Sequence, residues 1–472
     1  MKKRFSVVML VLISTLLVLA GCSSNNNSGS SGSSSSSSTG GGSSDKKEAV
    51  EISVWLTPQW KGVVSADENG ADYDSFFKYA AEKFAAQYDK YDATVKVEVI
   101  AGDQRDQLLN VNLTGGTPPD VFFESVFAMG DYVHRGAILP LTDIVDDAAR
   151  ADIESTYWDA VTFGDDIYFY PFQNNPGTFV YNADMFKAAG LEQYIGGEHE
   201  IKTWTLDEYQ TILDGLKNNL PKDQYSNAYP MGLFAVNNQA DTWNLSYLRM
   251  FGNDFFDADG NIILNDENGI KGAQWMKNLY DGGYTNPGAE SVSSNDVNAM
   301  FANQQVAISF TNPILYNNAM NAMEKGEAPK FDARIANIPA VDGALSFTYI
   351  TGAALFDTRD EKRIEVAKDF VKFFSSDEEL VLSSQNGIPV RKSVVDKVID
   401  VNPKFAAYSE NAKYIFNFTG NVPGYSQLRE VLYPELQAMY LGSKTPAEAV
   451  ASYQEKGNAV IKENKANSVI YQ

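Results

Sequence analysis

The sequence predicts an α/β protein built from two lobes, with a hinge and a cleft between them. The chain has 472 residues, which is more than one hydrophobic core usually serves, so two lobes are expected. Apolar residues alternate in residues 51–55 and 95–99, and they follow a helical period in residues 73–88. This order of strand, helix and strand predicts a parallel sheet, because parallel neighbours need a crossover connection.

Residues 173–176, which are three amides and a proline, are the predicted hinge. The aromatic run in residues 167–172 predicts a strand before them. Residues 178–181 predict a second strand, which leads into an amphipathic helix near Asp184. A chain that leaves one sheet, crosses an open polar segment and enters another sheet is expected to join two lobes at that point.

The N-terminus has the pattern of an export signal. Cationic residues 2–4 precede an apolar run over residues 7–20, which is too short to span a bilayer comfortably. The run ends in Leu19-Ala20-Gly21-Cys22, which resembles the lipobox of bacterial lipoproteins. That resemblance implies that residues 1–21 are a lipoprotein signal peptide and that Cys22 is lipidated. An ordinary signal peptide with a chance cysteine is the alternative, although Cys22 is the one cysteine of the chain.

Residues 22–48 are predicted to be a flexible tether. Residues 23–44 are almost wholly Ser, Gly and Asn, and such a segment cannot bury enough apolar surface to fold. A coil of this length extends about 25 Å on average. Lipid on Cys22 followed by a tether predicts anchoring at the extracellular face of the cell membrane, in a monoderm bacterium.

Composition excludes several classes of function. The formal net charge is −23 and the pI is about 4.5, so nucleic acid is not an expected partner, because phosphate binding needs a basic surface. With the one cysteine at the N-terminus and two histidines, His134 and His199, the folded part has no disulfide framework, Cys/His zinc site or cysteine nucleophile. Neither histidine lies in a nucleophile elbow, and no Walker or dinucleotide motif occurs, so no cofactor is predicted.

Several short patterns predict local structure. Residues 254–265 suggest a calcium loop, but the first loop position is Phe255 rather than an acidic residue. A β-hairpin turned by Asp259 and Gly260 is the better prediction, and no metal is expected. Three pairs with capping-box spacing predict helix starts: Thr205 with Glu208, Ser376 with Glu379, and Thr445 with Glu448.

Three other residues have alternative roles. Asp120 follows a tight turn and is expected to be a structural cap rather than a catalyst. Glu124 ends the strand predicted over residues 121–123 at the edge where open α/β sheets bind ligands, and an N-cap role around Ser125 is the alternative. Trp243 precedes an apolar helix, so it is either a cleft residue or a core residue.

Five segments resemble motifs of the extracellular solute-binding proteins of ABC importers, the family that includes the maltose-binding proteins. They are residues 108–143, 165–191, 203–208, 299–313 and 445–448. The resemblance implies a type II periplasmic-binding-protein-like fold and a binding protein rather than an enzyme. Two positions depart from the family pattern. Gln304 or Gln305 stands where that family usually has Gly, and Ile314 replaces a sugar-stacking Trp, which argues against a maltodextrin ligand.

Together with the hinge, the resemblance implies lobe 1 as residues 49–172 plus 350–420 and lobe 2 as residues 173–349 plus 421–472. It implies a monomeric receptor that captures a carbohydrate, expected to be an oligosaccharide, and delivers it to an ABC transporter permease. The aromatic content of 12% suits this ligand, because flat apolar rings stack on the C–H faces of sugars. The expected ligand-binding residues are Trp55, Gln59, Trp60, Glu124, Phe127, Asn174, Asn175, Trp243, Asn312 and Arg391.

Other functions stay open from the sequence. A lipid-anchored sensor or adhesin with the same fold is one alternative, and a polyamine or peptide ligand is another. A glycoside hydrolase with two catalytic carboxylates is a third, because 61 acidic residues allow many pairs whose separation in space the sequence does not fix.

Overall fold

The computed structural model describes residues 47–58, 73–102, 104–383, 387–398 and 404–472. These residues belong to one compact unit, residues 47–472, and residues 1–46 are grouped separately. The predicted signal peptide, Cys22 and the tether up to residue 46 lie outside the described residues, as do the candidate site residues Gln59 and Trp60. No helix within the described ranges is long and apolar enough to cross a membrane.

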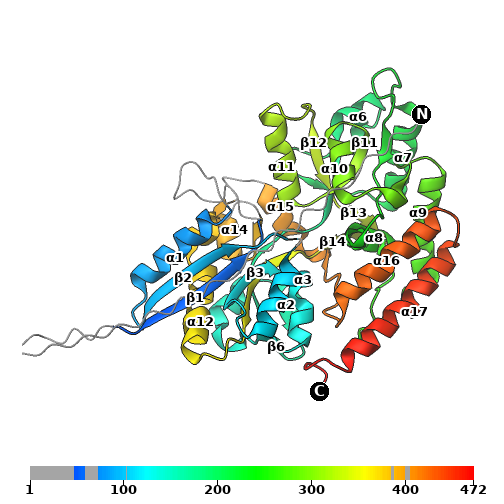
Figure 1. Ribbon diagram of the computed structural model, residues 1–472. Helices are drawn as coiled ribbons and strands as arrows, with labels where there is room; N and C mark the ends of the chain where they lie inside the picture. The colour runs from blue at the N-terminus through cyan, green and yellow to red at the C-terminus, as the bar shows by residue number, and fades with distance from the viewer. Residues whose placement is uncertain (1–46, 59–72, 103, 384–386, 399–403) are drawn as a thin grey trace, which may run out of the picture. The chain divides into compact units, whose positions relative to one another are not determined.

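The first sheet contains the predicted parallel pair. In spatial order its strands are β16 (Ile388–Pro389), β7 (Phe169–Asn174), β15 (Ile350–Phe356), β3 (Val121–Ser125), β1 (Ala49–Leu56) and β2 (Asp92–Val99), with β4 (Ile138–Leu139) beside β15. β1 pairs in parallel with β2 and with β3. β15 is antiparallel to both of its main neighbours, β3 and β7. The first two strands lie side by side in blue in Figure 1.

Aromatic side chains from two helices form the core on this sheet. The helices are α1 (Ser75–Gln87) and α12 (Glu361–Ser376). The ring of Phe77 stacks on Phe374 with centroids 4.9 Å apart and lies 4.8 Å from Phe123 of β3. All three rings are fully buried, and burial of each such side chain contributes roughly 1.5–3 kcal/mol.

Shorter elements complete this part of the molecule. They are α2 (Arg105–Gly115), α3 (Val126–His134), η1 (Thr142–Ile144), α4 (Asp147–Asp152), α5 (Ser155–Val161), the pair β5 (Thr162–Phe163) and β6 (Asp166–Ile167), α13 (Glu378–Ser383), α14 (Lys392–Val398) and α15 (Lys404–Glu410). The buried core cluster here draws its members from residues 50–172 and 350–394.

The chain passes from the first sheet to a second one at the predicted hinge, although Gln173 and Asn174 of that segment belong to β7 and pair with β15. Residues 175–177 connect β7 to β8 (Thr178–Asn182), which lies between antiparallel neighbours in the order β10 (Tyr229–Met231), β11 (Val306–Thr311), β8, β12 (Ala333–Ala336), β9 (Ile201–Lys202). A second passage leads back. It runs from β14 (Gly343–Phe347), which forms a small sheet with β13 (Ile338–Ala340) and β17 (Ile415–Phe416), into β15.

The two passages are hydrogen-bonded to each other. The Asn175 amide donates to the Tyr349 carbonyl at 2.9 Å, and the Gly177 amide donates to the Phe347 carbonyl at 3.2 Å. The Asn174 side chain accepts from the Tyr349 amide at 3.0 Å. A Cβ atom added at Gly177 would lie only 2.1 Å from the Phe347 ring, so this position needs glycine for close approach.

The second core surrounds the second sheet and includes the C-terminal helices. Its largest fully buried side chain is Trp204. The ring centroid of Trp204 lies 6.1 Å from that of Tyr209 and 5.8 Å from that of Phe186. In Figure 1 the two C-terminal helices, orange and red, run beside α9. The helical elements are α6 (Ala183–Ala188), η2 (Glu192–Tyr194), α7 (Leu206–Asn219), η3 (Asn238–Asp241), α8 (Thr242–Arg249), α9 (Glu267–Asp281), η4 (Ala289–Ser291), α10 (Ser294–Ala302), α11 (Pro313–Glu324), η5 (Asn411–Tyr414), α16 (Tyr425–Tyr440) and α17 (Pro446–Lys465).

We propose the predicted residue ranges as the two lobes. Members of the second core come from residues 179–347 and 418–461, which fits the predicted division at both passages. Phe418 departs from it, because it packs in the second core although the prediction places it in lobe 1. One segment assigned to lobe 1 also touches lobe 2: Ile388, Val395 and Tyr408 pack in a small cluster with Val180 and Val306. This segment therefore links the two cores.

Two of the three predicted helix starts are confirmed, and one is wrong. Capping boxes begin α7 at Thr205 and α17 at Thr445. Ser376 is instead the last residue of α12, and its hydroxyl donates to the Lys372 carbonyl at 2.6 Å. Asp377 takes the capping role, because its side chain accepts from the Leu380 amide at 3.0 Å. The aspartate next to a serine was the better acceptor.

The turn predicted at Asp259 and Gly260 is present, with shorter strands than a full hairpin. Gly260 has a φ of 73°, and an isolated antiparallel bridge joins Phe256 to Ile262. Of Gln304 and Gln305, one of which stands where the family usually has Gly, Gln304 has a φ of 58°. A left-handed backbone of this kind is adopted most readily by glycine.

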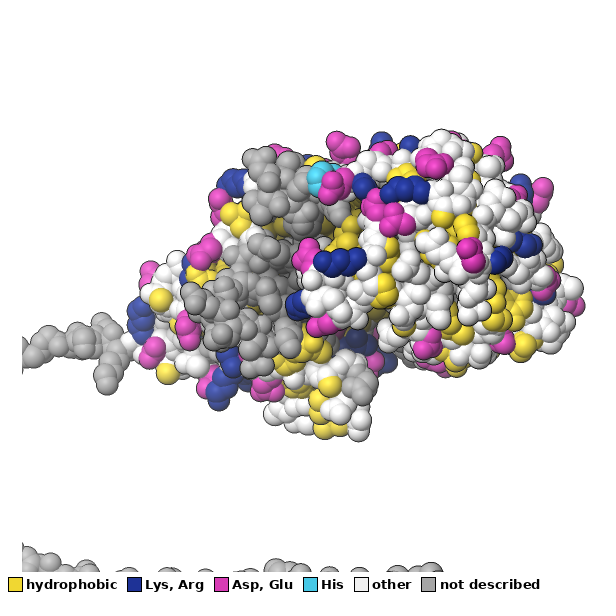
Figure 2. All heavy atoms as spheres, turned by 90° about the horizontal axis from the view of Figure 1, so that it is seen from above, with side chains coloured by type: hydrophobic (Ala, Val, Ile, Leu, Met, Phe, Trp, Pro, Cys, Tyr) yellow, Lys and Arg dark blue, Asp and Glu magenta, His cyan; other side chains and the backbone are white. Residues whose placement is uncertain are grey.

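Acidic and basic side chains are interspersed on the surface. On the face shown in Figure 2, Lys and Arg lie scattered among Asp and Glu, with no large basic area. Among the residues that the structure describes, no group of three or more His, Cys, Asp or Glu could hold a metal ion.

Candidate functional site

A cavity of about 330 Å³ lies between residues of both predicted lobes. Phe127 of α3 comes from lobe 1, and Tyr349 lies on the second passage between the sheets. The rest of the lining comes from lobe 2: Gln239, Thr242, Trp243, Ser294, Asn295, Asn298, Phe310, Asn312, Ile314, Leu315 and Arg429. The volume falls at the small end of the range for small-molecule sites in proteins.

Aromatic rings form one part of the cavity wall. The centroid of Trp243 lies 4.4 Å from Phe310 and 5.0 Å from Phe347, and its indole nitrogen donates to the Thr178 carbonyl at 3.3 Å. The ring centroids of Phe127 and Tyr349 are 5.1 Å apart. These contacts fix the orientation of the rings, and flat apolar faces of this kind stack on ligand C–H groups.

Arg429 is the ionised residue of the wall, and it is paired. Its Nε and Nη2 donate to the two carboxylate oxygens of Asp241 at 2.9 and 3.2 Å, and Tyr425 donates to the same carboxylate at 2.9 Å. The guanidinium carbon lies 5.1 Å from the centroid of Phe127. Burial alone would lower the pKa of Arg429, but attraction to Asp241 outweighs it, and the net shift is upward.

Amides and hydroxyls supply the remaining polar lining. Asn312 caps α11 by accepting from the Leu315 amide at 2.9 Å, so its Oδ1 is held in place. Ser294 donates to the Gln239 side chain at 2.6 Å. The side chains of Asn295 and Asn298 make no hydrogen bond to another described residue, and Asn298 is half-buried. Both amides are therefore available to a ligand.

Glu124 is buried and is not among the described residues that line the cavity. Its carboxylate accepts from Thr57 at 2.6 Å and from the Ser125 amide at 2.7 Å, and Arg105 Nη1 lies 3.8 Å away. Burial and then the charge of Glu124 raise the pKa of Tyr349 to about 12. The Tyr349 hydroxyl therefore stays protonated and can donate a hydrogen bond.

The structure brings three of the ten predicted site residues into the cavity wall: Phe127, Trp243 and Asn312. Trp55 is a core residue, 7% exposed, with its ring 5.9 Å from Phe122. Asn174 and Asn175 are fully buried in the passage beside the cavity. The role of each of the ten candidates in ligand binding stays a prediction.

Arg391 has a structural partner away from the cavity wall. Its Nε donates to Asp152 at 2.8 Å, and its Nη1 donates to the Ser375 carbonyl at 3.3 Å. Asp152 also accepts from the Ser393 amide at 2.8 Å. Arg391 thus anchors the segment after β16 to α4.

Sequence reasoning missed several lining residues. Arg429 and Tyr349 have no local motif, and their role depends on segments far apart in the chain. Asn295 and Asn298 are spaced three residues apart on α10, so both lie on one face of that helix. That spacing was the one signal available, and it is weak.

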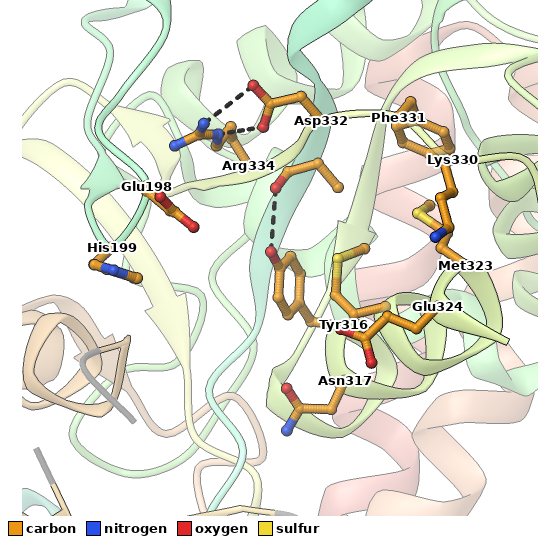
Figure 3. Close-up of a pocket in the computed structure, with 12 residues that line it drawn as sticks. Glu198, His199, Tyr316, Asn317, Met323, Glu324, Lys330, Phe331, Asp332 and Arg334 are labelled. Atoms are coloured by element: carbon orange, nitrogen blue, oxygen red, sulfur yellow. Dashed lines mark hydrogen bonds and ion pairs between the residues drawn. The ribbon is translucent and has the colours of Figure 1, made fainter. Parts of the chain in front are cut away.

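A second and larger cavity, about 520 Å³, lies beside α11 and β12. Figure 3 shows its lining, in which Arg334 is paired with Asp332 and Tyr316 donates to the Ala333 carbonyl at 3.1 Å. Its other charged residues include Glu198, Glu324 and Lys330. All of its described lining comes from the predicted lobe 2, so a ligand there would not contact both lobes. We therefore assign the candidate site to the smaller cavity.

Comparison with known proteins identifies the family of this chain. The chain matches the family of bacterial extracellular solute-binding proteins over residues 68–380. It belongs to that family, and its two-lobed fold with a hinge and a cleft between the lobes is the fold of the periplasmic binding proteins.

Several similar proteins are named as binding proteins. A protein of Brucella abortus (strain 2308) named as a binding protein is 23% identical over 84% of this chain and 92% of its own. The arabinooligosaccharide-binding protein of Bacillus subtilis (strain 168) is 24% identical over 73% of this chain and 77% of its own. An ABC transporter solute-binding protein of Thermotoga lettingae, solved with α-D-tagatose, has a TM-score of 0.68 at 19% identity and covers 87% of this chain and 99% of its own.

Proposed function

We propose that this protein is a lipid-anchored extracellular receptor that captures a carbohydrate in the cavity between its lobes and delivers it to an ABC transporter permease. The main support is the composition of the cavity wall. The rings of Trp243, Phe310 and Phe127 supply apolar lining, and amides and hydroxyls surround them. Sugars need both features, because their rings expose C–H faces and their rims expose hydroxyls.

The arrangement also supports closure on the ligand. Phe127 and Trp243 belong to different predicted lobes, and both line the cavity. A ligand that contacts both lobes at once favours the closed state by its differential affinity. The passages at residues 174–177 and 347–350 are two of the connections that such a motion would bend, and the third lies near residue 420, where the predicted lobe 1 ends.

The cavity favours binding over hydrolysis. Glycoside hydrolysis needs two carboxyl groups that flank the scissile bond. Among the described residues that line the cavity, none is Asp or Glu. The same lining argues against a polyamine ligand, which needs carboxylates for its charges.

A thermal-shift screen of the full chain tests the ligand class. The panel contains arabinose, glucose, galactose and their oligosaccharides, together with putrescine, spermidine and short peptides. A ligand at a hundred times its dissociation constant stabilises the native state by about 2.7 kcal/mol, which raises the melting temperature by several degrees. We expect a shift with a saccharide that is recovered unchanged. A shift only with amines or peptides would contradict the proposal, and cleavage of the saccharide would favour a hydrolase.

A second experiment tests the lipid anchor. In a monoderm host the wild-type chain should partition with membranes, and mass spectrometry should find acyl chains on Cys22. A Cys22→Ala chain should instead appear unprocessed at its usual site or free in the medium. Identical membrane attachment of both chains would exclude lipid on Cys22.

A further inference from the structure

We infer that the cavity is selective for uncharged saccharides, and that the Arg429–Asp241 pair sets this selectivity. This inference rests on the proposed function, since it specifies the ligand of the same cavity. It goes further than the sugar class, because it predicts which chemical variants of one sugar are rejected and which side chains reject them.

The charges near the cavity are compensated within the protein. Arg429 is the one ionised side chain among the described residues of the lining, and its guanidinium forms a two-point contact with Asp241 at 2.9 and 3.2 Å. Asp241 is 2% exposed, so it acts from behind the wall. Glu124, whose charge acts on Tyr349, likewise has Arg105 at 3.8 Å. The wall therefore offers hydrogen bonds without a net charge.

Arg429 keeps donor capacity despite this pair. Its Nε and Nη2 point at Asp241, and its Nη1 has no hydrogen-bond partner among the described residues. Phe127 covers the guanidinium at 5.1 Å from the ring centroid, which holds the plane in position. A neutral hydroxyl can accept from Nη1 without disturbing the pair.

Charged ligands meet no matching charge in this wall. A sugar carboxylate that approaches Arg429 also approaches Asp241, and the repulsion cancels much of the attraction. An ammonium group finds no carboxylate among the described lining residues. Either ion would lose its hydration without full compensation, which is costly in a buried site. The amides of Asn295, Asn298 and Asn312 and the hydroxyl of Tyr349 serve a neutral ligand instead.

Matched ligands test this inference on the wild-type full chain. Titration calorimetry compares glucose, galactose or the neutral oligosaccharide identified by the screen with two analogues of the same sugar. In one analogue the primary hydroxymethyl group is oxidised to a carboxylate, and in the other a hydroxyl is replaced by an amine. We expect both charged analogues to bind at least ten times more weakly at pH 7. Equal or tighter binding of the carboxylate would overturn the inference and leave the receptor function intact.

The variant Asp241→Asn tests the role of the pair. It removes the compensating charge and keeps the shape, so the carboxylate analogue should gain at least tenfold in affinity relative to the neutral sugar. An unchanged ratio in the folded variant would overturn the role of Asp241. Asp214→Asn is the matched control. Asp214 accepts a hydrogen bond of 2.6 Å from the Tyr284 hydroxyl, and it does not line the cavity. If Asp241→Asn does not fold, the comparison of ligands on the wild type still decides the selectivity of the cavity. Failure of every saccharide to bind the wild type would contradict the proposed function itself.

Discussion

Asn298 allows ligand binding to be tested apart from folding. Its side chain lines the cavity and makes no hydrogen bond to another described residue. Asn298→Ala should therefore weaken saccharide binding by about two- to tenfold, because one hydrogen bond contributes about 0.5–1.5 kcal/mol. Its free energy of unfolding should stay within about 0.5 kcal/mol of the wild type. Calorimetry and urea denaturation measure the two effects. Asn318→Ala, at an exposed position of α11 outside the cavity, should change neither quantity.

Gly177 is expected to tolerate no side chain. A Cβ atom there would lie 2.1 Å from Phe347, whose ring packs 5.0 Å from Trp243 in the cavity wall. Gly177→Ala should lower the free energy of unfolding by about 1–3 kcal/mol through overpacking and should weaken saccharide binding by moving Trp243. Chemical denaturation and calorimetry detect the two effects. Gly102→Ala, where a Cβ would meet nothing within 4 Å, is the control. Equal stability of the two variants would contradict the predicted clash.

The individual residues show how far the sequence could identify the site. Phe127, Trp243 and Asn312 could be predicted because each follows a recognisable strand end or helix start. Trp55 met the same criterion, but its side chain points into the core beside Phe122, and one-residue alternation along a strand decides that outcome. Arg429 could not be predicted, because its partner Asp241 lies 188 positions away in the chain.

At the scale of elements, α16 begins without a cap of its own. Its N-cap is Gly424, and the carboxylate of Asp131 in α3 takes over by accepting from the amides of Gly424, Tyr425 and Ser426 at 2.8, 3.2 and 3.2 Å. An acidic group at this end also complements the helix dipole. Because α3 and α16 hold Phe127 and Arg429, this contact fixes two parts of the cavity wall relative to each other.

Removal of this shared cap should affect both stability and binding. Asp131→Ala should lower the free energy of unfolding by about 1 kcal/mol, as for other lost caps. It should also weaken saccharide binding, because α16 presents Arg429. Thr205→Ala removes a cap of the same kind inside lobe 2, where Thr205 accepts from the Glu208 amide at 3.1 Å. Urea denaturation should show a similar loss in both variants, and calorimetry should show weaker binding only in Asp131→Ala. Weaker binding in both would indicate a general effect of destabilisation.

Element boundaries could be predicted where their signals are local. The capping boxes at Thr205 and Thr445 consist of residues three positions apart, so the sequence displays them directly. The cap of α16 consists of residues 293 positions apart, and only the tertiary structure brings them together. The β1–α1–β2 unit could likewise be predicted, because it follows from local periodicity. The antiparallel pairing of β15 with β3 could not, because it depends on where the chain returns to the first sheet.

At the scale of the whole molecule, the C-terminal segment connects the two cores. α17 packs in the second core, whereas Ile470 beyond it packs against the first. The connection is made at His134 of α3: its ring nitrogens contact the Ser468 hydroxyl at 2.9 Å and the Asn421 carbonyl at 3.0 Å, and its carbonyl accepts from the Val469 amide at 3.0 Å. Since a carbonyl only accepts, Nε2 must hold a proton and Nδ1 accepts from Ser468 in the neutral ring.

This connection should weaken in mild acid. Burial lowers the pKa of His134, opposed by its hydrogen bond to Asn421 and by the charge of Asp131. The unfolded chain therefore binds a proton at higher pH than the folded one. The stability linked to neutral His134 is present above about pH 6.5 and is lost as the pH falls through the lower folded pKa.

The variant His134→Gln provides the test. Urea denaturation at pH 7.5, 6.5 and 5.5 should show a larger loss of stability on acidification for the wild type than for His134→Gln, which keeps a donor for Asn421 but does not titrate. His199→Gln, at the exposed second histidine, should follow the wild type. Parallel curves for the wild type and His134→Gln would show that His134 does not contribute to the pH dependence. A difference confined to His134→Gln would instead show that the contacts of His134 with the C-terminal segment and Asn421 make the stability of the protein depend on pH.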